Sequence, residues 1–180
     1  YYKECLNDKT AMDAYFLYET PDGKHGIIAI ETKYTDILGT NPASNPSFAI
    51  RQATENIGIS QLLTDEGIAG ITKRDIKLSQ VYRNFLLTET VRLHEHLDDS
   101  ISIILSPKEN ISNEEDESSL RSILKDEYKY KFQSVTLDSF VSALIREFPD
   151  IDLFRRFESR YLDFERVERL LKSVERIVMN

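Results

Sequence analysis

Apolar side chains mark two strand-length segments near the N-terminus. Residues 11–19 (AMDAYFLYE) and 26–34 (GIIAIETKY) are rich in aromatic and branched side chains. Residues 21–24 (PDGK) between them are typical of a tight turn, so the segments together predict a β-hairpin. Because the second segment is apolar on both faces, we expect a central strand that helices cover on both sides.

Helical spacing and another buried strand follow. After an insertion rich in Asn, Pro and Ser, a short helix is predicted near residues 48–56. A long helix is predicted over residues 73–94, where apolar side chains recur at helical intervals, and residues 101–105 (ISIIL) predict a short buried strand. The predicted element order is therefore β-β-α-β.

The C-terminal part is predicted to be mainly helical. We expect an amphipathic helix over residues 113–124, an edge strand at residues 128–132 where Tyr and Lys alternate, and a helix capped by Thr136 that ends before Pro149. Residues 163–180 predict an amphipathic helix that packs on its own domain, the alternative being a dimer contact.

Length and composition are those of an ordinary globular domain. The 180 residues carry a formal net charge of −8, one cysteine and no apolar run that could cross a bilayer. We expect a single domain over residues 1–180 in a reducing, cytoplasmic compartment; because it begins with Tyr, the chain can also be a piece of a longer protein. The acidic balance argues against bulk attraction to nucleic acid but is compatible with an acidic metal site beside local basic patches.

Two charged residues interrupt the second apolar strand. Glu31 and Lys33 are two residues apart and therefore project from the same face, at the C-terminal end of the strand. Charges are rare in central strands unless they are paired or bind a metal, because removing them from water is costly. Asp13 lies in the neighbouring strand, at the end that an antiparallel hairpin places beside them. The three side chains can therefore converge.

The register of the hairpin decides whether they do. A two-residue turn at residues 22–23 would place Asp13 opposite Thr32 and on the wrong face. A three-residue loop or a β-bulge instead places Asp13 opposite Lys33 or Glu31. We therefore predict an odd loop or a bulge in this hairpin.

Such a cluster has the chemistry of a metal-dependent phosphodiesterase. The Asp13 and Glu31 carboxylates, with the backbone carbonyl of Thr32 as a further oxygen ligand, can hold Mg²⁺ or Mn²⁺ against a scissile phosphate. The Lys33 ammonium can orient or deprotonate the attacking water and stabilise the developing negative charge. The alternative is an ordinary surface ion pair between Glu31 and Lys33.

The spacing of these residues resembles a known signature. Asp13, seventeen intervening residues and then Glu31-Thr32-Lys33 at the end of an Ile-rich strand are similar to the motif of the PD-(D/E)XK nuclease superfamily, with Met12 where the motif has Pro. Residues 80–87 (QVYRNFLL) and 160–164 (RYLDF) resemble segments of uncharacterised bacterial proteins described as restriction endonucleases. The resemblance implies an α/β, restriction-endonuclease-like mixed β-sheet flanked by helices around the β-β-α-β core.

Polar residues of the long predicted helix are candidates for further roles. Gln80 stands where related nucleases often place a polar group that faces the active site; the alternative is a solvated helix residue. Lys73, Arg74 and Lys77 cluster near the start of this helix and, with Arg83, can contact phosphates; the alternative is a charged solvent face.

Two other patterns favour simpler interpretations. A second Glu-x-Lys, from Glu127 to Lys129, has no hairpin partner that supplies an Asp and is interpreted as solvated charge. His94 and His96 do not share a helix face and Cys5 is far away in sequence, so a zinc site is disfavoured.

The sequence thus predicts a Mg²⁺- or Mn²⁺-dependent endonuclease, a hydrolase of DNA phosphodiester bonds in a restriction or defence setting. Its predicted catalytic residues are Asp13, Glu31, Lys33 and Gln80. The rival hypothesis is a catalytically inactive module that keeps the fold to bind nucleic acid or a protein partner. DNA is the expected partner and a membrane is not, while a homodimer stays open.

Overall fold

Most of the chain is described by a computed structural model, which covers residues 4–6, 9–34, 48–73, 80–108, 110, 114–166 and 168–169. The chain divides into two units, residues 1–134 and residues 135–180, and each is described by itself. The prediction of a single domain over the whole chain stays a prediction. None of the described helices is long and apolar enough to cross a membrane.

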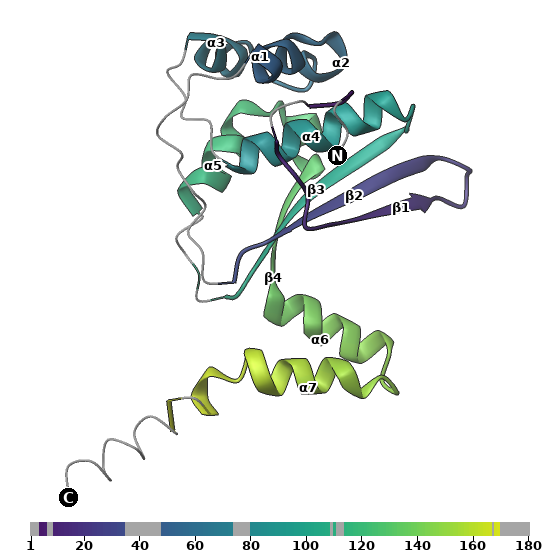
Figure 1. Cartoon of the computed structure of the whole chain (residues 1–180), viewed down its shortest axis with the longest axis vertical. Helices are drawn as coiled ribbons and strands as arrows, with labels where there is room; N and C mark the ends of the chain where they lie inside the picture. Colours follow the sequence, from purple (N-terminus) through teal and green to yellow (C-terminus); the bar gives the residue numbers. More distant parts are fainter. Residues whose placement is uncertain are drawn as a thin grey trace, which may run out of the picture. The chain divides into compact units, whose positions relative to one another are not determined.

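A four-stranded sheet runs in the order β1-β2-β3-β4 (Figure 1). β1 (Ala14–Glu19) pairs antiparallel with β2 (His25–Thr32), and β2 pairs parallel with β3 (Asp99–Ser106). β4 (Phe132–Thr136) follows at the far edge. The sheet is therefore mixed, and the predicted β-β-α-β core is confirmed. Because parallel neighbours need a crossover, the helices between β2 and β3 must return the chain to the starting end of the sheet.

The crossover contains α1 (Phe48–Glu55), α2 (Ile57–Ser60), α3 (Asp65–Lys73) and α4 (Gln80–His94). α4 packs on β2 and β3, and α1 and α2 pack on α4 (Figure 1). Between these layers α4 is buried on several sides, which explains why polar residues such as Asn84, Thr88 and Glu89 are buried along with its apolar ones. α4 is thus the central helix of the first unit.

The long helix predicted over residues 73–94 is found as α4 only from Gln80 onward. Lys73 is instead the last residue of α3, a helix that was not predicted, and residues 74–79 lie outside the described residues. The Thr64 hydroxyl caps α3 by accepting the Gly67 N–H at 3.0 Å. The apolar side chains whose helical spacing predicted this helix include Val81, Tyr82 and Phe85, and these three are buried.

One predicted strand is wrong. The helix expected over residues 113–124 is present as α5 (Glu114–Ile123), but residues 126–131 form a 3-10 helix, η2 (Asp126–Lys131), rather than an edge strand. The physical reason lies in Lys131 and Phe132, which are adjacent and both buried. Neighbouring residues of a strand point to opposite faces, whereas a helical turn before β4 allows both side chains to reach the interior.

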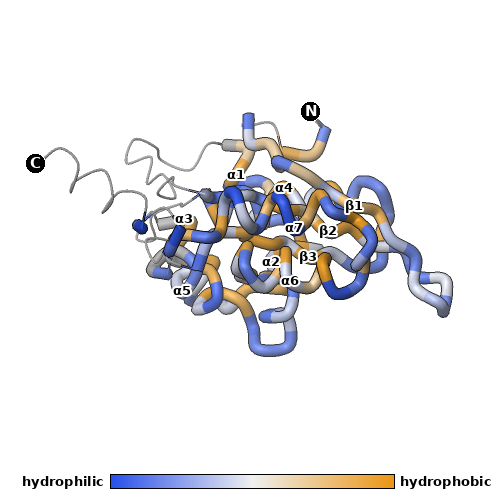
Figure 2. The backbone as a smooth tube through the Cα atoms, turned by 90° about the horizontal axis from the view of Figure 1, so that it is seen from below, coloured by the Kyte–Doolittle hydropathy of each residue, from blue (hydrophilic) through white to orange (hydrophobic). Residues whose placement is uncertain are grey.

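Burial is uneven between the two faces of β2. Ile27 and Ala29 are fully buried on the face that carries α4, whereas Ile28 and Ile30 on the other face are only half-buried. The prediction that both faces are fully covered is therefore wrong for the residues described. Figure 2 shows hydrophobic residues concentrated along β2 and β3, in contrast to the more hydrophilic hairpin tip.

The second unit contains α6 (Leu137–Glu147) and α7 (Asp152–Tyr161). As predicted, the Thr136 hydroxyl caps α6 by accepting the Ser139 N–H at 3.2 Å, and the helix ends before Pro149. α7 was not predicted. Most of the helix expected over residues 163–180 lies outside the described residues, so its packing stays a prediction.

A buried charge cluster ties η2 to α4 and β3. Lys131 Nζ lies 2.7 Å from Asp99 Oδ1 and 3.5 Å from Glu89 Oε1. Glu89 also accepts the Ser100 hydroxyl at 2.5 Å and the Arg92 Nε–H at 2.7 Å. Burial alone would raise the pKa of Asp99, but its bonds with Lys131 and the Ser100 backbone outweigh burial and hold that pKa below its usual range.

We predict that Lys131→Met destabilises the fold by about 3–5 kcal/mol, because it leaves half-buried Asp99 without its cation and buried Glu89 with Arg92 alone. The control is Lys129→Met, which removes an exposed ion pair with Asp126 and should change little. Since the pKa of Asp99 is lowered by folding, its stabilisation is present above its unfolded pKa and is lost as pH falls through the lower folded value. Urea unfolding across acidic pH should show this loss of stability in the parent and a smaller loss in Lys131→Met. Equal free energies of unfolding for Lys131→Met and Lys129→Met would contradict the prediction.

Candidate active site

A three-residue loop sets the register of the β1–β2 hairpin. The Thr20 N–H donates to the Lys24 carbonyl and the Gly23 N–H to the Thr20 carbonyl, both at 2.8 Å. Gly23 has φ +81°, a left-handed conformation that suits glycine and closes the loop. The predicted odd loop is confirmed.

The odd register brings Asp13 beside the end of β2. Ala14 pairs with Ile30, so one further step places Asp13 beside Glu31, although the Asp13 N–H donates to the Ile30 carbonyl at 3.1 Å and makes this end of the ladder irregular. The Asp13 carboxylate accepts the Thr32 N–H at 2.7 Å. This side chain therefore lies against the backbone that joins Glu31 to Lys33.

Glu31 and Lys33 form a buried ion pair. Lys33 Nζ lies 2.7 Å from Glu31 Oε1, and the side chains are only 11% and 6% exposed, respectively. They continue the α4-covered face of β2 that begins with Ile27 and Ala29. An ordinary surface ion pair does not describe this arrangement. Removing both charges from water has a cost that a purely structural strand does not require.

Gln80, the first residue of α4, reaches the same carboxylate. Its Nε2–H donates to Glu31 Oε1 at 2.6 Å, so this oxygen accepts from both Gln80 and Lys33. The expectation that Gln80 faces Glu31 and Lys33 is therefore confirmed, and its alternative as a solvated residue is wrong. Its catalytic role stays a prediction.

A contact from the end of β3 was missed by the sequence. The Lys33 N–H donates to the Leu105 carbonyl at 2.8 Å, and the Asn110 Nδ2–H donates to the Lys33 carbonyl at 3.4 Å. The end of β3 and the nearby Asn110 thus hold the backbone of Lys33. No sequence signal linked Asn110 to the site, because the contact depends on the parallel pairing of β2 with β3.

The oxygen atoms of this cluster suit a hard divalent cation. Among the described residues no three His, Cys, Asp or Glu side chains gather into a metal site. Mg²⁺, however, is commonly held by one or two carboxylates while waters and substrate phosphates complete its shell. Thr32, whose N–H donates to Asp13, also carries the backbone carbonyl that was predicted as a further oxygen ligand, and that role stays a prediction. Asp13, Glu31 and this carbonyl therefore fit Mg²⁺ or Mn²⁺ better than zinc.

Of the residues predicted to contact phosphates, only Arg83 has a described side chain. Arg83 lies half-buried on α4. The side chain of Lys73 and all of Arg74 and Lys77 lie outside the described residues. Their roles in nucleic-acid binding stay predictions.

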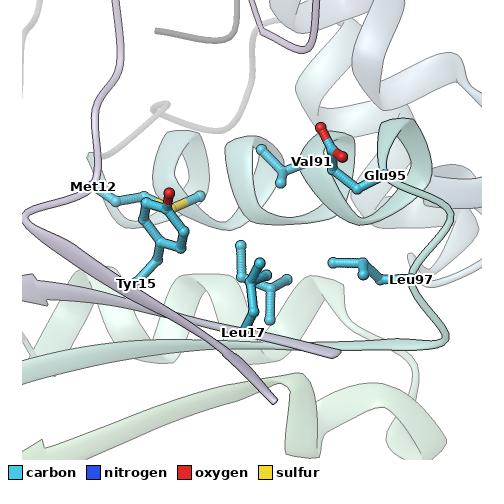
Figure 3. Close-up of a pocket in the computed structure, with 7 residues that line it drawn as sticks. Met12, Tyr15, Leu17, Val91, Glu95 and Leu97 are labelled. Carbon is cyan, nitrogen blue, oxygen red and sulfur yellow. The ribbon is translucent and has the colours of Figure 1, made fainter. Parts of the chain in front are cut away.

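An apolar pocket lies apart from the charged cluster. It has a volume of about 130 Å³ and is framed by β1 and by α4 with the turn that follows it (Figure 3). Glu95 is the single ionisable carboxylate among its lining residues, which are Met12, Tyr15, Leu17, Ile27, Val91, Glu95 and Leu97. This pocket lacks the converging charges of the Glu31 cluster and is not the candidate active site.

We predict that Asp13→Ala speeds hydrogen exchange of the Thr32 amide, because it removes the acceptor of that N–H. Asp13→Asn retains a carbonyl oxygen and should keep most of the protection. The measurement is amide exchange by NMR without added metal, with the Lys33 amide as internal control because its acceptor is Leu105. Thr32 exchange in Asp13→Ala as slow as in the parent would show that Asp13 does not hold this amide.

Comparison with known proteins agrees with this geometry. A family model described as the PD-(D/E)XK nuclease superfamily matches residues 2–163, nearly the whole chain. No curated protein and no solved structure matches the chain. The match includes the hairpin, the crossover helices and the strand that follows, and it confirms the resemblance to this superfamily. The chain belongs to the PD-(D/E)XK nuclease superfamily.

Proposed function

We propose that the protein is a Mg²⁺-dependent nuclease that hydrolyses DNA phosphodiester bonds, and that it acts inside the cell in a restriction or defence setting. One observation carries the proposal. Glu31 is buried at the end of a central strand, where Lys33 and Gln80 both donate to its carboxylate and Asp13 holds the adjacent backbone. The match to a nuclease superfamily supports phosphodiester hydrolysis as the class of reaction.

Each side chain has a distinct proposed role. Asp13 and Glu31, with the Thr32 carbonyl, hold the cation, which when bound supplies charge to neutralise the attacked phosphate. Lys33 turns its ammonium toward the attacking water and the phosphate oxygens. In the metal-free protein Gln80 orients the Glu31 carboxylate through its hydrogen bond. These roles need the groups to be held in place before substrate arrives, and burial between β2 and α4 provides that restraint for Glu31 and Lys33.

Charge distribution supports a local rather than a global attraction to DNA. The chain has a net charge of −8, so phosphate binding must depend on cations close to the site. We propose Lys73, Arg74, Lys77 and Arg83 for this contact. A cation held by Asp13 and Glu31 also removes two negative charges from the path of the substrate.

We predict that Mg²⁺ or Mn²⁺ raises the melting temperature of the parent, since the cation binds the folded site and not the unfolded chain. Asp13→Asn and Glu31→Gln should abolish this rise and DNA cleavage. Lys33→Ala should keep most of the rise while cleavage falls by about 100-fold or more, because both carboxylates remain. The measurements are thermal melts with and without metal, beside cleavage of mixed DNA substrates.

The second Glu-x-Lys of the chain offers a matched control. Glu127 is exposed and Lys129 pairs with Asp126 on η2, so Glu127→Gln and Lys129→Ala should melt and cut like the parent. Each variant is compared with its own metal-free melt, because Glu31→Gln and Lys33→Ala also disturb a buried ion pair. Carboxylate variants that still respond to metal and cut DNA like the parent would contradict the proposal, and metal binding without cleavage by the parent would favour an inactive binding module.

A further inference from the structure

Asn84 is a buried amide on α4 that lacks a hydrogen-bond partner. The residue is 4% exposed, and within the part of the chain that the structure describes neither its Nδ2 nor its Oδ1 makes a hydrogen bond. Burying an amide without partners is costly, and such groups are uncommon in folded proteins. An apolar side chain of similar size would pack at this position without that cost. The amide therefore needs a reason other than stability.

The position of Asn84 connects it with the candidate active site. Asn84 follows Gln80 by four residues, and side chains at this spacing are neighbours on one face of a helix. Gln80 is the residue that donates to Glu31 Oε1. Further along α4, Glu89 accepts from Ser100, which pairs with Ile27 at the opposite end of β2. Asn84 thus lies between the Gln80–Glu31 and Glu89–Ser100 hydrogen bonds.

The present partners of Glu31 conflict with its proposed role. Lys33 and Gln80 both direct N–H hydrogens at the same oxygen, Oε1. Because these hydrogens carry positive charge, a Glu31 carboxylate that ligates a divalent cation favours the departure of at least one donor. Lys33 can turn toward the water and the phosphate. Gln80 is neutral and half-buried, and it needs another polar group within reach.

We propose that Asn84 is a positioning residue of the proposed nuclease site: its buried amide becomes the hydrogen-bond partner of the Gln80 side chain when Glu31 binds a divalent cation. The inference rests on the proposed function and adds to it. In the metal-free protein the unpartnered amide lowers stability. In the metal-bound protein it receives a partner, so Asn84 increases metal affinity by acting through Gln80.

The test compares Asn84→Leu, Gln80→Leu and the double variant in the full chain, with Mn²⁺ alone as probe. We expect Asn84→Leu to raise the metal-free melting temperature by about 2–4 °C, because it removes an unpartnered buried amide. It should also weaken Mn²⁺ binding by about 3–10-fold, measured by calorimetry, while adding little to the loss already caused by Gln80→Leu. Thr88→Val is the control, since it removes another buried polar group of α4 and should leave Mn²⁺ affinity unchanged.

An unchanged Mn²⁺ affinity in Asn84→Leu would overturn the inference, as would an equal loss with and without Gln80. If Asn84→Leu does not fold, Asn84→Ala supports the same comparison of affinities. Glu31→Gln separates this inference from the proposed function. If Glu31→Gln abolishes Mn²⁺ binding but Asn84→Leu leaves Mn²⁺ affinity unchanged, only the role of Asn84 is wrong. If Glu31→Gln binds Mn²⁺ like the parent, the proposed metal site is wrong, and this inference is wrong with it.

Discussion

The site depends on one buried ion pair at the end of a central strand. Glu31 and Lys33 lie on the face of β2 that α4 covers, where a cation or an anion alone would be strongly unfavourable. Their mutual contact and the Gln80 amide offset that cost, and they also fix where each charge lies. The arrangement keeps a carboxylate and an ammonium close together and largely out of water, which is the condition under which charged groups interact most strongly with a ligand.

α4 gives this pair its surroundings. Its first residue, Gln80, contacts Glu31, and Glu89 near its other end joins the buried cluster with Ser100 and Lys131. The helix is therefore pinned to the sheet by polar contacts at both ends, with Phe85 and its apolar neighbours packed between them. The position of Gln80 relative to β2 is fixed by the whole helix rather than by local sequence, and the site is correspondingly rigid.

Local chemistry explains which features the sequence could predict. The turn at residues 21–24, the parity of Glu31 and Lys33 and the apolar face of α4 depend on neighbours in the chain, and each is found in the structure. The strand predicted at residues 128–132 is wrong because the Lys131 ammonium forms ion pairs with Glu89 and Asp99. These partners are distant in sequence, so the alternation of Tyr and Lys could not indicate the contact. The contacts of Asp13 with Thr32 and of Asn110 with Lys33 arise from strand pairing, so only the fold could place them.

The central claim is that a divalent cation binds at the end of β2, and paramagnetic broadening by Mn²⁺ tests it most directly. At low Mn²⁺ concentration we expect the amide NMR signals of Thr32, Lys33 and Asp13 to broaden first, because broadening falls steeply with distance from the ion. Among the described residues of the second unit, Asp138, Glu158 and Asp163 line one pocket without gathering into a metal site, and they serve as a comparison. Broadening centred there, or at Glu127 and Lys129, with Thr32 and Lys33 unaffected, would contradict the account.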